Sequence, residues 1–492
     1  MNQKIRKILI YLLFILLGLA FYSHFFKFPI ISLVTLGGII FIAYKIKIPK
    51  FALVLFIVAF ILRLIVVFIF KTPIQSDYAV MYNMANDMLD GNWDVIAESE
   101  YMNRYGYQMG YTMFMYLLML IVKGPLLIKI VNCLFSAGIV LFIYLLAKEF
   151  TSEKAARIVS CCYMFFPFPL LFNTVLSNQH ISSFMFLLAI WLLISKKANK
   201  INEKLKFTLI GVCLAIGNII RPEAIVIITS IILFTLLIYK KGMLKRSLVN
   251  LGIMAIVYFS ITTIVSLEFQ YSGLSPNGLK NTETLYKFAV GFNQERMGDY
   301  NKNLGKEFFN LTESEKKNLV YNYTIGSIDK LPRLFIHKLQ HFWATSDVGW
   351  SLSYLNDKSI HILGKQISAN ALIKLVDEIN QLFIYVFIFL SILAIWINRK
   401  NMSNQQFLLL MVLLVYTGVY LLIECTPRYA YTAQIFMFIM SAYSVDYIIK
   451  RKIENKHVLQ IKGVKKIKSD ENFNKKKFSN RKNRSKDKIN VK

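Results

Sequence analysis

The stretch KTPIQSDYAVMYNMANDML, at positions 71–89, places a carboxylate close to a long apolar run. Asp77, between Ser76 and Tyr78, follows within eight residues of FALVLFIVAFILRLIVVFIF, which is long enough to cross a membrane. A carboxylate at a membrane surface can take the proton of a hydroxyl group as that group attacks a substrate. Asp77 can also cap a helix that begins near Tyr78, because Ser and Asp are favoured N-caps. The residues alone leave both interpretations open.

Three arginines lie in or beside apolar runs and could bind an anion. Arg221 precedes a proline and Arg428 follows one, each at the end of a run. Arg63 lies inside its run, about 10 Å from the end, where an arginine is costly without a partner or a cavity. Guanidinium groups bind phosphate strongly, whereas snorkelling to lipid headgroups would explain the same positions.

The composition is that of a polytopic membrane protein. Of the 492 residues 56% are hydrophobic, the mean hydropathy is +0.48, and the apolar residues fall in long blocks. No span of more than about 110 residues is polar enough to form a separate soluble domain. The five cysteines lie in or beside apolar segments, which is typical of small core residues rather than of disulfides or a metal site. The N-terminal segment has no convincing cleavage site, so we interpret it as a retained anchor.

The fold expected is an all-α polytopic membrane protein with about 12 transmembrane helices. The lysines and arginines of short loops fall on one side if the N-terminus is inside, as the positive-inside rule requires. This holds only if residues 107–122 do not cross, so we expect a juxtamembrane helix there, with Tyr105, Tyr107 and Tyr111 at headgroup level. Both termini are then cytoplasmic. The expected spans are 8–26, 29–44, 51–70, 126–147, 157–175, 179–195, 207–221, 224–239, 249–267, 377–398, 406–423 and 428–449.

Two long segments lie outside in this topology, and a basic tail lies inside. Residues 71–106 carry six acids, of which we interpret Asp87, Asp90 and Asp94 as solvated loop acids. Residues 268–376 are expected to form short helices and to end in an interfacial helix. The tail, 450–492, carries 17 basic residues against four acids and is expected to be disordered near anionic inner-leaflet lipids. No aromatic platform accompanies it, so we expect no nucleic-acid partner.

Several segments, taken in order, resemble glycosyltransferase family 39, the protein O-mannosyltransferase-like group of the integral-membrane GT-C superfamily. The resemblance covers roughly residues 51–449 and leaves 1–50 as an additional N-terminal transmembrane hairpin. It implies a GT-C-like core over 51–267, a large outer loop over 268–376 and C-terminal transmembrane helices over 377–449. The segments that carry it are the outer loop with SDY, the stretch GYQMGY, FNTVLSNQHISSFMFLLAIWLL at 172–193, GVCLAIGNIIRPEAIVI at 211–227 and ECTPRYAYTAQIFMFIMSAY at 424–443.

The resemblance implies an enzyme that takes a sugar from a polyprenyl-phosphate carrier at the outer face of the cell membrane and passes it to an acceptor hydroxyl. It assigns the general-base role to the first acid of the first outer loop, which is Asp77. The leaving group is then a lipid phosphate, for which Arg221 and Arg428 match family positions. Further substrate-binding roles are expected for Tyr78, Arg104, Glu223 and Lys338.

Two departures from the family pattern bear on the chemistry. Gln179 stands where the family often has an acid, so either a second acid is dispensable or donor recognition has changed. The first outer loop has no DxD or ExD pair, and the E-x-E of Glu98 and Glu100 lies far from the expected position. We therefore expect neither a metal ion nor a cofactor.

Two other classes of function fit the same composition. A transporter or flippase of lipid-linked sugars also needs about twelve helices and cationic phosphate sites, but transporters usually have repeat halves, and we find no convincing internal repeat. A non-catalytic cell-envelope assembly protein would not depend on Asp77. The sequence does not identify the sugar, and it leaves the acceptor open between protein, wall polymer and lipid.

Overall fold

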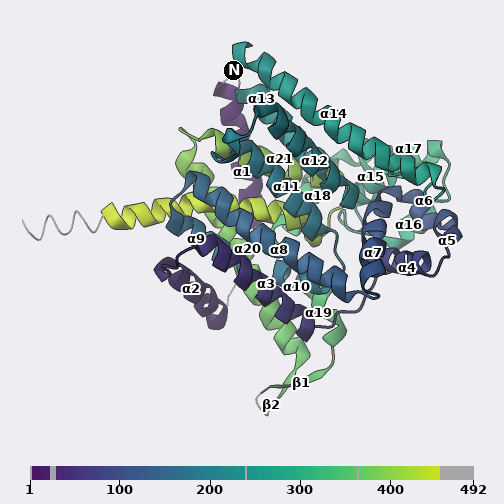
Figure 1. Cartoon of the computed structure of the whole chain (residues 1–492), viewed down its shortest axis with the longest axis horizontal. Coiled ribbons are helices and arrows are strands. Elements are labelled where there is room, and N and C mark those ends of the chain that lie inside the picture. The colour runs from purple at the N-terminus through teal and green to yellow at the C-terminus, as the bar shows by residue number, and fades with distance from the viewer. Residues whose placement is uncertain (1–2, 23–28, 239–240, 363–364, 455–492) are drawn as a thin grey trace, which may run out of the picture.

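Helices make up nearly all of the structure, a computed structural model that describes residues 3–22, 29–238, 241–362 and 365–454 (Figure 1). The predicted tail from residue 455 onward lies outside these ranges. The N-terminal helices are α1 (Gln3–Tyr22), α2 (Ile30–Lys45) and α3 (Phe51–Ile69). The first outer segment forms α4 (Asp77–Leu89), α5 (Asp94–Glu98), α6 (Glu100–Arg104) and η1 (Gly106–Gln108), and α7 (Met109–Ile121) follows.

The central and C-terminal helices form the apolar body of the molecule. The central helices are α8 (Leu126–Phe150), α9 (Glu153–Met164), α10 (Pro167–Leu171), η2 (Phe172–Thr174), α11 (Gln179–Ile194), η3 (Ala198–Lys200), α12 (Glu203–Ile220), α13 (Ala224–Ile238) and α14 (Lys241–Tyr271). The C-terminal ones are α20 (Ala369–Asn398), α21 (Asn404–Leu422) and the C-terminal helix, Pro427–Glu454, whose first turn is η6 (Pro427–Ala430).

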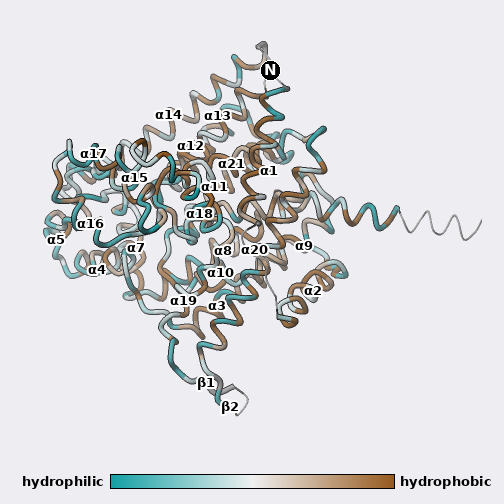
Figure 2. The backbone as a smooth tube through the Cα atoms, turned by 180° about the vertical axis from the view of Figure 1, so that it is seen from behind, coloured by the Kyte–Doolittle hydropathy of each residue, from teal (hydrophilic) through white to brown (hydrophobic). Residues whose placement is uncertain are grey.

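The large outer segment forms short helices, as the sequence predicts, and also a hairpin that the sequence did not indicate. Its helices are α15 (Thr284–Phe292), α16 (Lys302–Phe308), α17 (Glu313–Tyr323), η4 (Ile325–Lys330), α18 (Leu331–Ala344), α19 (Gly349–Leu352) and η5 (Ser353–Leu355). Strands β1 (Ser359–Ile362) and β2 (Lys365–Ser368) pair antiparallel, with Ser359 opposite Ser368. Figure 2 shows more hydrophilic chain around α4, α5, α16 and α17 than in the brown body of the bundle.

Every predicted span overlaps a helix or a helix pair of the described residues. Six helices there are long and apolar enough to cross a membrane, and the number is seven if one bent pair counts as a span. Apolar helices α2, α11 and α13 are shorter, so the count of twelve stays a prediction. The bent pair is α9 with α10 and η2, which meet at 54°. Pro167 explains the break, because a proline disfavours helical backbone at the residue before it.

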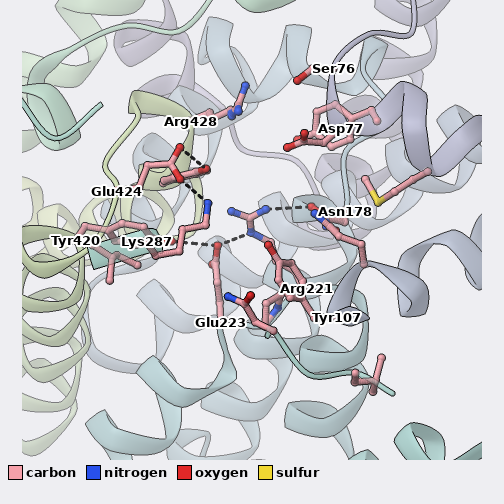
Figure 3. A pocket seen from close by; sticks show the side chains of 18 of the residues that line it. Ser76, Asp77, Tyr107, Asn178, Arg221, Glu223, Lys287, Tyr420, Glu424 and Arg428 are labelled. Carbon is pink, nitrogen blue, oxygen red and sulfur yellow. Dashed lines mark hydrogen bonds and ion pairs between the residues drawn. The ribbon is translucent and has the colours of Figure 1, made fainter. Parts of the chain in front are cut away.

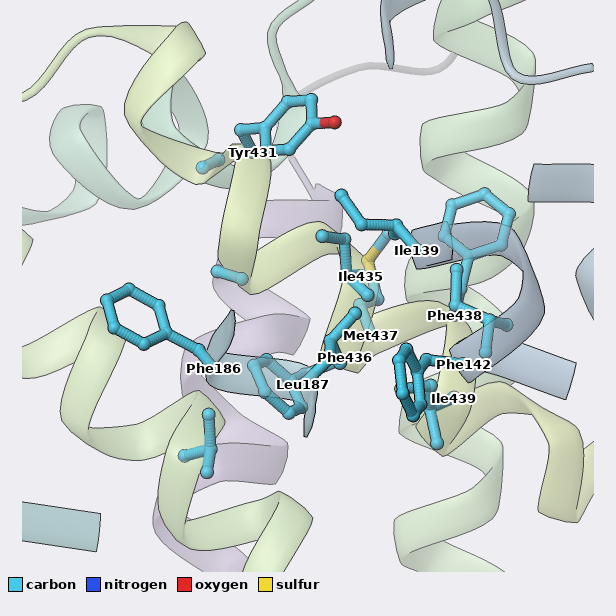
Figure 4. Packing of buried hydrophobic residues seen from close by; sticks show 14 of the residues in the cluster. Ile139, Phe142, Phe186, Leu187, Tyr431, Ile435, Phe436, Met437, Phe438 and Ile439 are labelled. Atoms are coloured by element: carbon cyan, nitrogen blue, oxygen red, sulfur yellow. The ribbon is translucent and has the colours of Figure 1, made fainter. Parts of the chain in front are cut away.

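Part of the extended core lies where α8, α11 and the C-terminal helix meet (Figure 4). Ile139 of α8, Phe186 of α11 and Phe436 of the C-terminal helix are fully buried. Burial of such side chains contributes about 1.5–3 kcal/mol each in water. In lipid, close packing between the helices contributes more than the removal of apolar surface from water, because lipid tails are as apolar as the side chains.

The helix ends fall into two groups on opposite sides of the bundle. One cavity is lined by residues at ends expected outside, which are the ends of α12 and α21 and the starts of α11 and the C-terminal helix. Hydrogen bonds join ends expected inside: Arg157 to the Ile46 carbonyl at 2.6 Å, Ser195 to Glu149 at 2.6 Å, and the Ser152 amide to Asp446 at 3.0 Å. The direction of the whole bundle in a membrane stays a prediction.

The chain enters and leaves α7 on the cavity side. Gln108, just before α7, lines the cavity. Lys129, in the first turn of α8, donates from Nζ to the carbonyl of Thr72, just after α3, at 3.5 Å. The prediction of headgroup-level tyrosines was wrong for Tyr111. This side chain is fully buried, stacks on Phe114 and contacts Asn132, because α7 packs against the protein along that face.

Candidate active site

A cavity of about 340 Å³ opens where the first outer segment meets the helix ends (Figure 3). The close approach of η1 to residues 278–280 shapes one side, because a Cβ at Gly106 would lie 2.3 Å from the Gly278 carbonyl oxygen. Tyr105 and Asn281 join the same two segments in a single β-bridge. The cavity is lined by Ser76, Asp77, Tyr78, Met81, Tyr107, Gln108, Asn178, Arg221, Pro222, Glu223, Leu279, Asn281, Lys287, Trp350, Tyr420, Ile423, Glu424, Arg428 and Tyr429.

Asp77 is the first residue of α4 and presents a free carboxylate to this cavity. The N-cap of α4 is Ser76, whose side chain makes no capping bond. Within the described ranges the Asp77 carboxylate takes part in no hydrogen bond or ion pair, and the residue is exposed. The geometry therefore gives no support to helix capping by Asp77. Figure 3 shows its carboxylate and the Arg428 guanidinium facing the same space.

Arg428 and Arg221 both line the cavity, but their charges are used differently. Arg428 stacks on Trp350, with 4.4 Å from its Cζ to the ring centroid, and forms no ion pair within 4 Å in the described part of the chain. Arg221 is held in place by an ion pair with Glu223 and by a 3.2 Å bond to the Asn178 side chain. The guanidinium of Arg428 is therefore more available to bind an anion than that of Arg221.

Glu223 is a satisfied buried acid rather than a free one. It is 6% exposed and accepts hydrogen bonds from the hydroxyls of Tyr416 and Tyr420 at 3.4 Å and of Thr432 at 3.1 Å, besides the Arg221 pair. These partners occupy both carboxylate oxygens of Glu223.

A second ion pair in the cavity, Lys287 with Glu424, was missed by sequence reasoning. Burial alone would lower the pKa of Lys287, but Tyr429 and Glu424 raise it well above its usual value. The Tyr429 hydroxyl also donates to Glu424 at 3.4 Å. The sequence did offer one sign of this pair. Glu424 is an acid at the end of an apolar span, at the start of the ECTPRYAY segment.

Gln179 supports the backbone that carries Arg428. Its side-chain amide donates to the Arg428 carbonyl oxygen at 2.8 Å, and the residue is 1% exposed. An ionised carboxylate has no proton to donate, so an acid at this position would lose the bond. The departure from the family pattern therefore has a local structural reason.

Two predicted substrate-binding residues lie outside the cavity lining. Arg104 pairs with Glu100 at 3.0 Å and lies 4.1 Å over the ring of Phe309, near the surface. Lys338 is buried behind the cavity wall and donates to three backbone carbonyls. The interfacial helix predicted around it, α18, packs its Leu339 and Phe342 into the protein.

Arg63 lies in the apolar body, and its partners are neutral. It is fully buried, donates from Nε to the Ser136 hydroxyl at 2.7 Å and from Nη1 to the Ala59 carbonyl at 3.1 Å. Its Nη2 has no hydrogen-bond partner among the described residues. The predicted partner for this arginine is therefore Ser136, and no acid lies within ion-pair distance in that part of the chain.

A further acid, Asp347, lies near Arg428. Burial raises the pKa of Asp347 to about 7, although Arg428 and His341 act in the opposite direction. Within the described ranges no three His, Cys, Asp or Glu side chains are grouped so that they could hold a metal ion. The expectation of a metal-free site stays a prediction.

Residues 109–265 match the model of a family described as dolichyl-phosphate-mannose-protein mannosyltransferase. The predicted family resemblance is confirmed. The match indicates a glycosyltransferase, and together with the apolar helices it indicates a multi-pass membrane protein. It covers about a third of the chain. Among the cavity residues, Asn178, Arg221, Pro222 and Glu223 fall inside it, whereas Asp77 and Arg428 fall outside.

No curated protein matches the chain, whereas several solved structures do. A crystal structure of the Archaeoglobus fulgidus oligosaccharyltransferase, tethered with an acceptor peptide, is 14% identical, with a TM-score of 0.44, over 82% of this chain and 50% of that chain. The oligosaccharyltransferase AglB from the same organism, in complex with an inhibitory peptide and a dolichol-phosphate, is 14% identical, with a TM-score of 0.43, over 84% and 52%. This chain spans about half the length of those chains.

Proposed function

We propose that this chain transfers a sugar from a polyprenyl-phosphate donor to an acceptor hydroxyl at the outer face of the cell membrane. One observation carries the proposal. The free carboxylate of Asp77 and the unpaired guanidinium of Arg428 line one cavity at the ends of apolar helices. The donor's lipid tail would lie in the bilayer, so its phosphate and sugar would reach only groups at such helix ends.

The reaction needs a base and a site for the leaving phosphate. The acceptor oxygen attacks the anomeric carbon while the bond from that carbon to the phosphate oxygen breaks. Asp77 takes the proton of the hydroxyl as the new bond forms. The phosphate leaves with the bonding electron pair, and Arg428 stabilises the charge on it through charge-assisted hydrogen bonds.

The rest of the cavity is suited to a sugar ring. The Arg221–Glu223 and Lys287–Glu424 pairs are fixed polar groups that can bond to ring hydroxyls, and Tyr107 and Trp350 add aromatic side chains to the lining. A volume of about 340 Å³ is near the lower end of ligand pockets. These features favour a donor with a small glycan, and they leave the acceptor open between protein, wall polymer and lipid.

The deciding experiment measures sugar transfer from polyprenyl-phosphate sugars in membranes that contain the chain or its Asp77→Asn variant. Asn keeps the size of Asp but cannot take the proton, so transfer should fall by about 10²-fold or more. Asp87→Asn is the matched control, because Asp87 lies on the same helix but does not line the cavity.

Protein level and donor binding are measured beside transfer in the same membranes. Loss of transfer with donor binding intact would separate catalysis from the transporter and assembly-protein alternatives. Near-normal transfer by the Asn variant would remove Asp77 as the base.

A further inference from the structure

Lys338 of α18 joins the carboxyl ends of two helices that form one wall of the cavity. Its side chain is 1% exposed, and Nζ donates to the carbonyls of Gly291 at 2.9 Å, Leu421 at 2.8 Å and Ile423 at 2.8 Å. Gly291 lies in the last turn of α15, and the other two lie at the end of α21. The last carbonyls of a helix lack partners within it, and an ammonium has three donors and no acceptor. One side chain therefore caps both helices.

The ammonium has no carboxylate within ion-pair distance in the described residues. The negative ends of the α15 and α21 dipoles take the place of an acid. Burying a charged group is costly unless its hydrogen bonds are made, so the charged side chain favours the arrangement in which all three carbonyls converge.

The capped helix ends carry the cavity ion pair that sequence reasoning missed. Lys287 belongs to α15, and Glu424 comes after Ile423, the C-cap of α21. Figure 3 shows the two side chains paired. The Glu424 amide donates to the Lys287 carbonyl at 3.0 Å, and the Cys425 amide donates to the Gly298 carbonyl at 2.9 Å. Gly298 itself packs against the Lys338 stem, since a Cβ there would lie 2.8 Å from Lys338 Cδ.

We infer that Lys338 is a positioning residue, which caps α15 and α21 and so holds Lys287, Glu424 and the following Arg428 around the cavity. It does not touch the reacting groups, in contrast to the substrate contact predicted for it. Its importance for transfer rests on the proposed function. Its effect on the cavity wall does not, and the two are measured separately.

Cys425 gives a native probe of the cavity wall. It is 1% exposed, and its Sγ lies 3.8 Å from the Lys338 carbonyl. The full chain in membranes is treated with a small maleimide, and the peptide that contains Cys425 is quantified by mass spectrometry. Loss of buried hydrogen bonds from a charged donor should promote local opening, so Lys338→Met should increase labelling by roughly tenfold or more. Lys338→Gln keeps two N–H donors and should label less than the Met variant.

Lys316→Met is the control for removal of a buried lysine. Lys316 is 6% exposed, belongs to α17 and pairs with Glu283 at 3.0 Å, away from the cavity lining. Labelling of Cys425 in this variant should stay at the wild-type level. Unchanged labelling in Lys338→Met would overturn the capping role.

Sugar transfer is measured on the same membranes. Lys338→Met should lose transfer by roughly tenfold or more, and Lys338→Gln should restore part of it in step with Cys425 protection. If Lys338→Met increases the labelling of Cys425 but leaves sugar transfer unchanged, Lys338 caps the two helices but does not position groups that transfer needs. If wild-type membranes transfer no sugar at all, the proposed function fails, and the labelling still decides whether Lys338 holds this wall.

Discussion

The two arginines predicted to bind phosphate differ in what already occupies their guanidinium groups. Arg221 is paired with Glu223, so its removal would leave an acid that is 6% exposed without its cation. Breaking a buried pair from one side typically costs about 3–5 kcal/mol. Arg428 has no ion pair within 4 Å in the described part of the chain and lies against Trp350. The same substitution should therefore have different effects at the two positions.

Arg428→Ala should keep the protein folded and weaken donor binding by about 10- to 100-fold, the range for a hydrogen bond to a charged group. Arg221→Ala should instead lower the thermal stability of the detergent-solubilised protein, and Arg221→Ala with Glu223→Gln should recover part of it. Donor binding and melting temperature are measured on all three variants. Unchanged donor binding in Arg428→Ala would remove this residue from the phosphate site. Equal melting temperatures of Arg221→Ala and of the Arg221→Ala, Glu223→Gln double variant would show that the unpaired Glu223 carboxylate is not what destabilises the single variant.

At the residue scale, the sequence identified the groups that carry an obvious charge next to a span. Asp77, Arg221, Glu223 and Arg428 could be found because each stands within eight residues of the end of an apolar run. Lys287 could not, since nothing in the mixed segment around it shows that it meets Glu424 across 137 positions. The burial of Lys338 depends on two helix ends from distant parts of the chain, and charge alone suggested a surface role.

At the scale of elements, the start of α4 shows how the chain aims Asp77. Ser76 has φ 56° and ψ −143°, a backbone conformation that residues other than glycine rarely adopt. Such a conformation costs about 1–3 kcal/mol and persists only where the surroundings impose it. Here it turns the chain between the end of α3 and the first turn of α4, which places the Asp77 carboxylate at the cavity.

Ser76→Gly should raise the melting temperature, because glycine adopts this conformation without the steric cost, although its greater freedom in the unfolded chain offsets part of the gain. Ser76→Ala should be nearly neutral, since the serine side chain makes no capping bond. Melting of the detergent-solubilised variants by circular dichroism gives the comparison. A glycine variant less stable than the alanine variant would show that the backbone at this position is not strained.

Long apolar helices were the elements that sequence periodicity and composition could predict. The break between α9 and α10 was missed although Pro167 marks it, because the apolar run continues through the proline. The β1–β2 hairpin has no strong turn signal in its sequence, and α18 was expected to lie at the lipid interface because its apolar face is as well suited to lipid as to protein. Amphipathicity identifies the buried face of a helix and not what covers it.

At the scale of the whole molecule, the arrangement of helix ends constrains the topology. Ends that should share a side under the positive-inside rule do gather on the same side, with the cavity at one face and the Arg157, Glu149 and Asp446 contacts at the other. For these helices the agreement supports the predicted alternation of the spans, which stays a prediction for the whole chain. It does not fix which face is outside, because a bundle turned over has the same internal contacts.

Thiol labelling on intact cells decides which face is outside. The five native cysteines are all buried, so single cysteines introduced at exposed positions should be labelled over a low background. The positive-inside rule places Asn92 and Asn303 outside and Asn199 inside, and all three side chains are exposed. Neighbouring Asn301 is unsuitable, because it is 4% exposed and caps α16.

An impermeant maleimide should therefore label the Asn92→Cys and Asn303→Cys variants on intact cells, and should label Asn199→Cys only after the membrane is opened. The reason is electrostatic, since the loop around Asn199 carries Lys196, Lys197, Lys200 and Lys204 and basic loops resist translocation. Labelling of Asn199→Cys on intact cells, with the other two protected, would place the cavity on the cytoplasmic side. The donor would then have to present its phosphate and sugar at the inner leaflet, and the proposal of an outer-face transferase would fall.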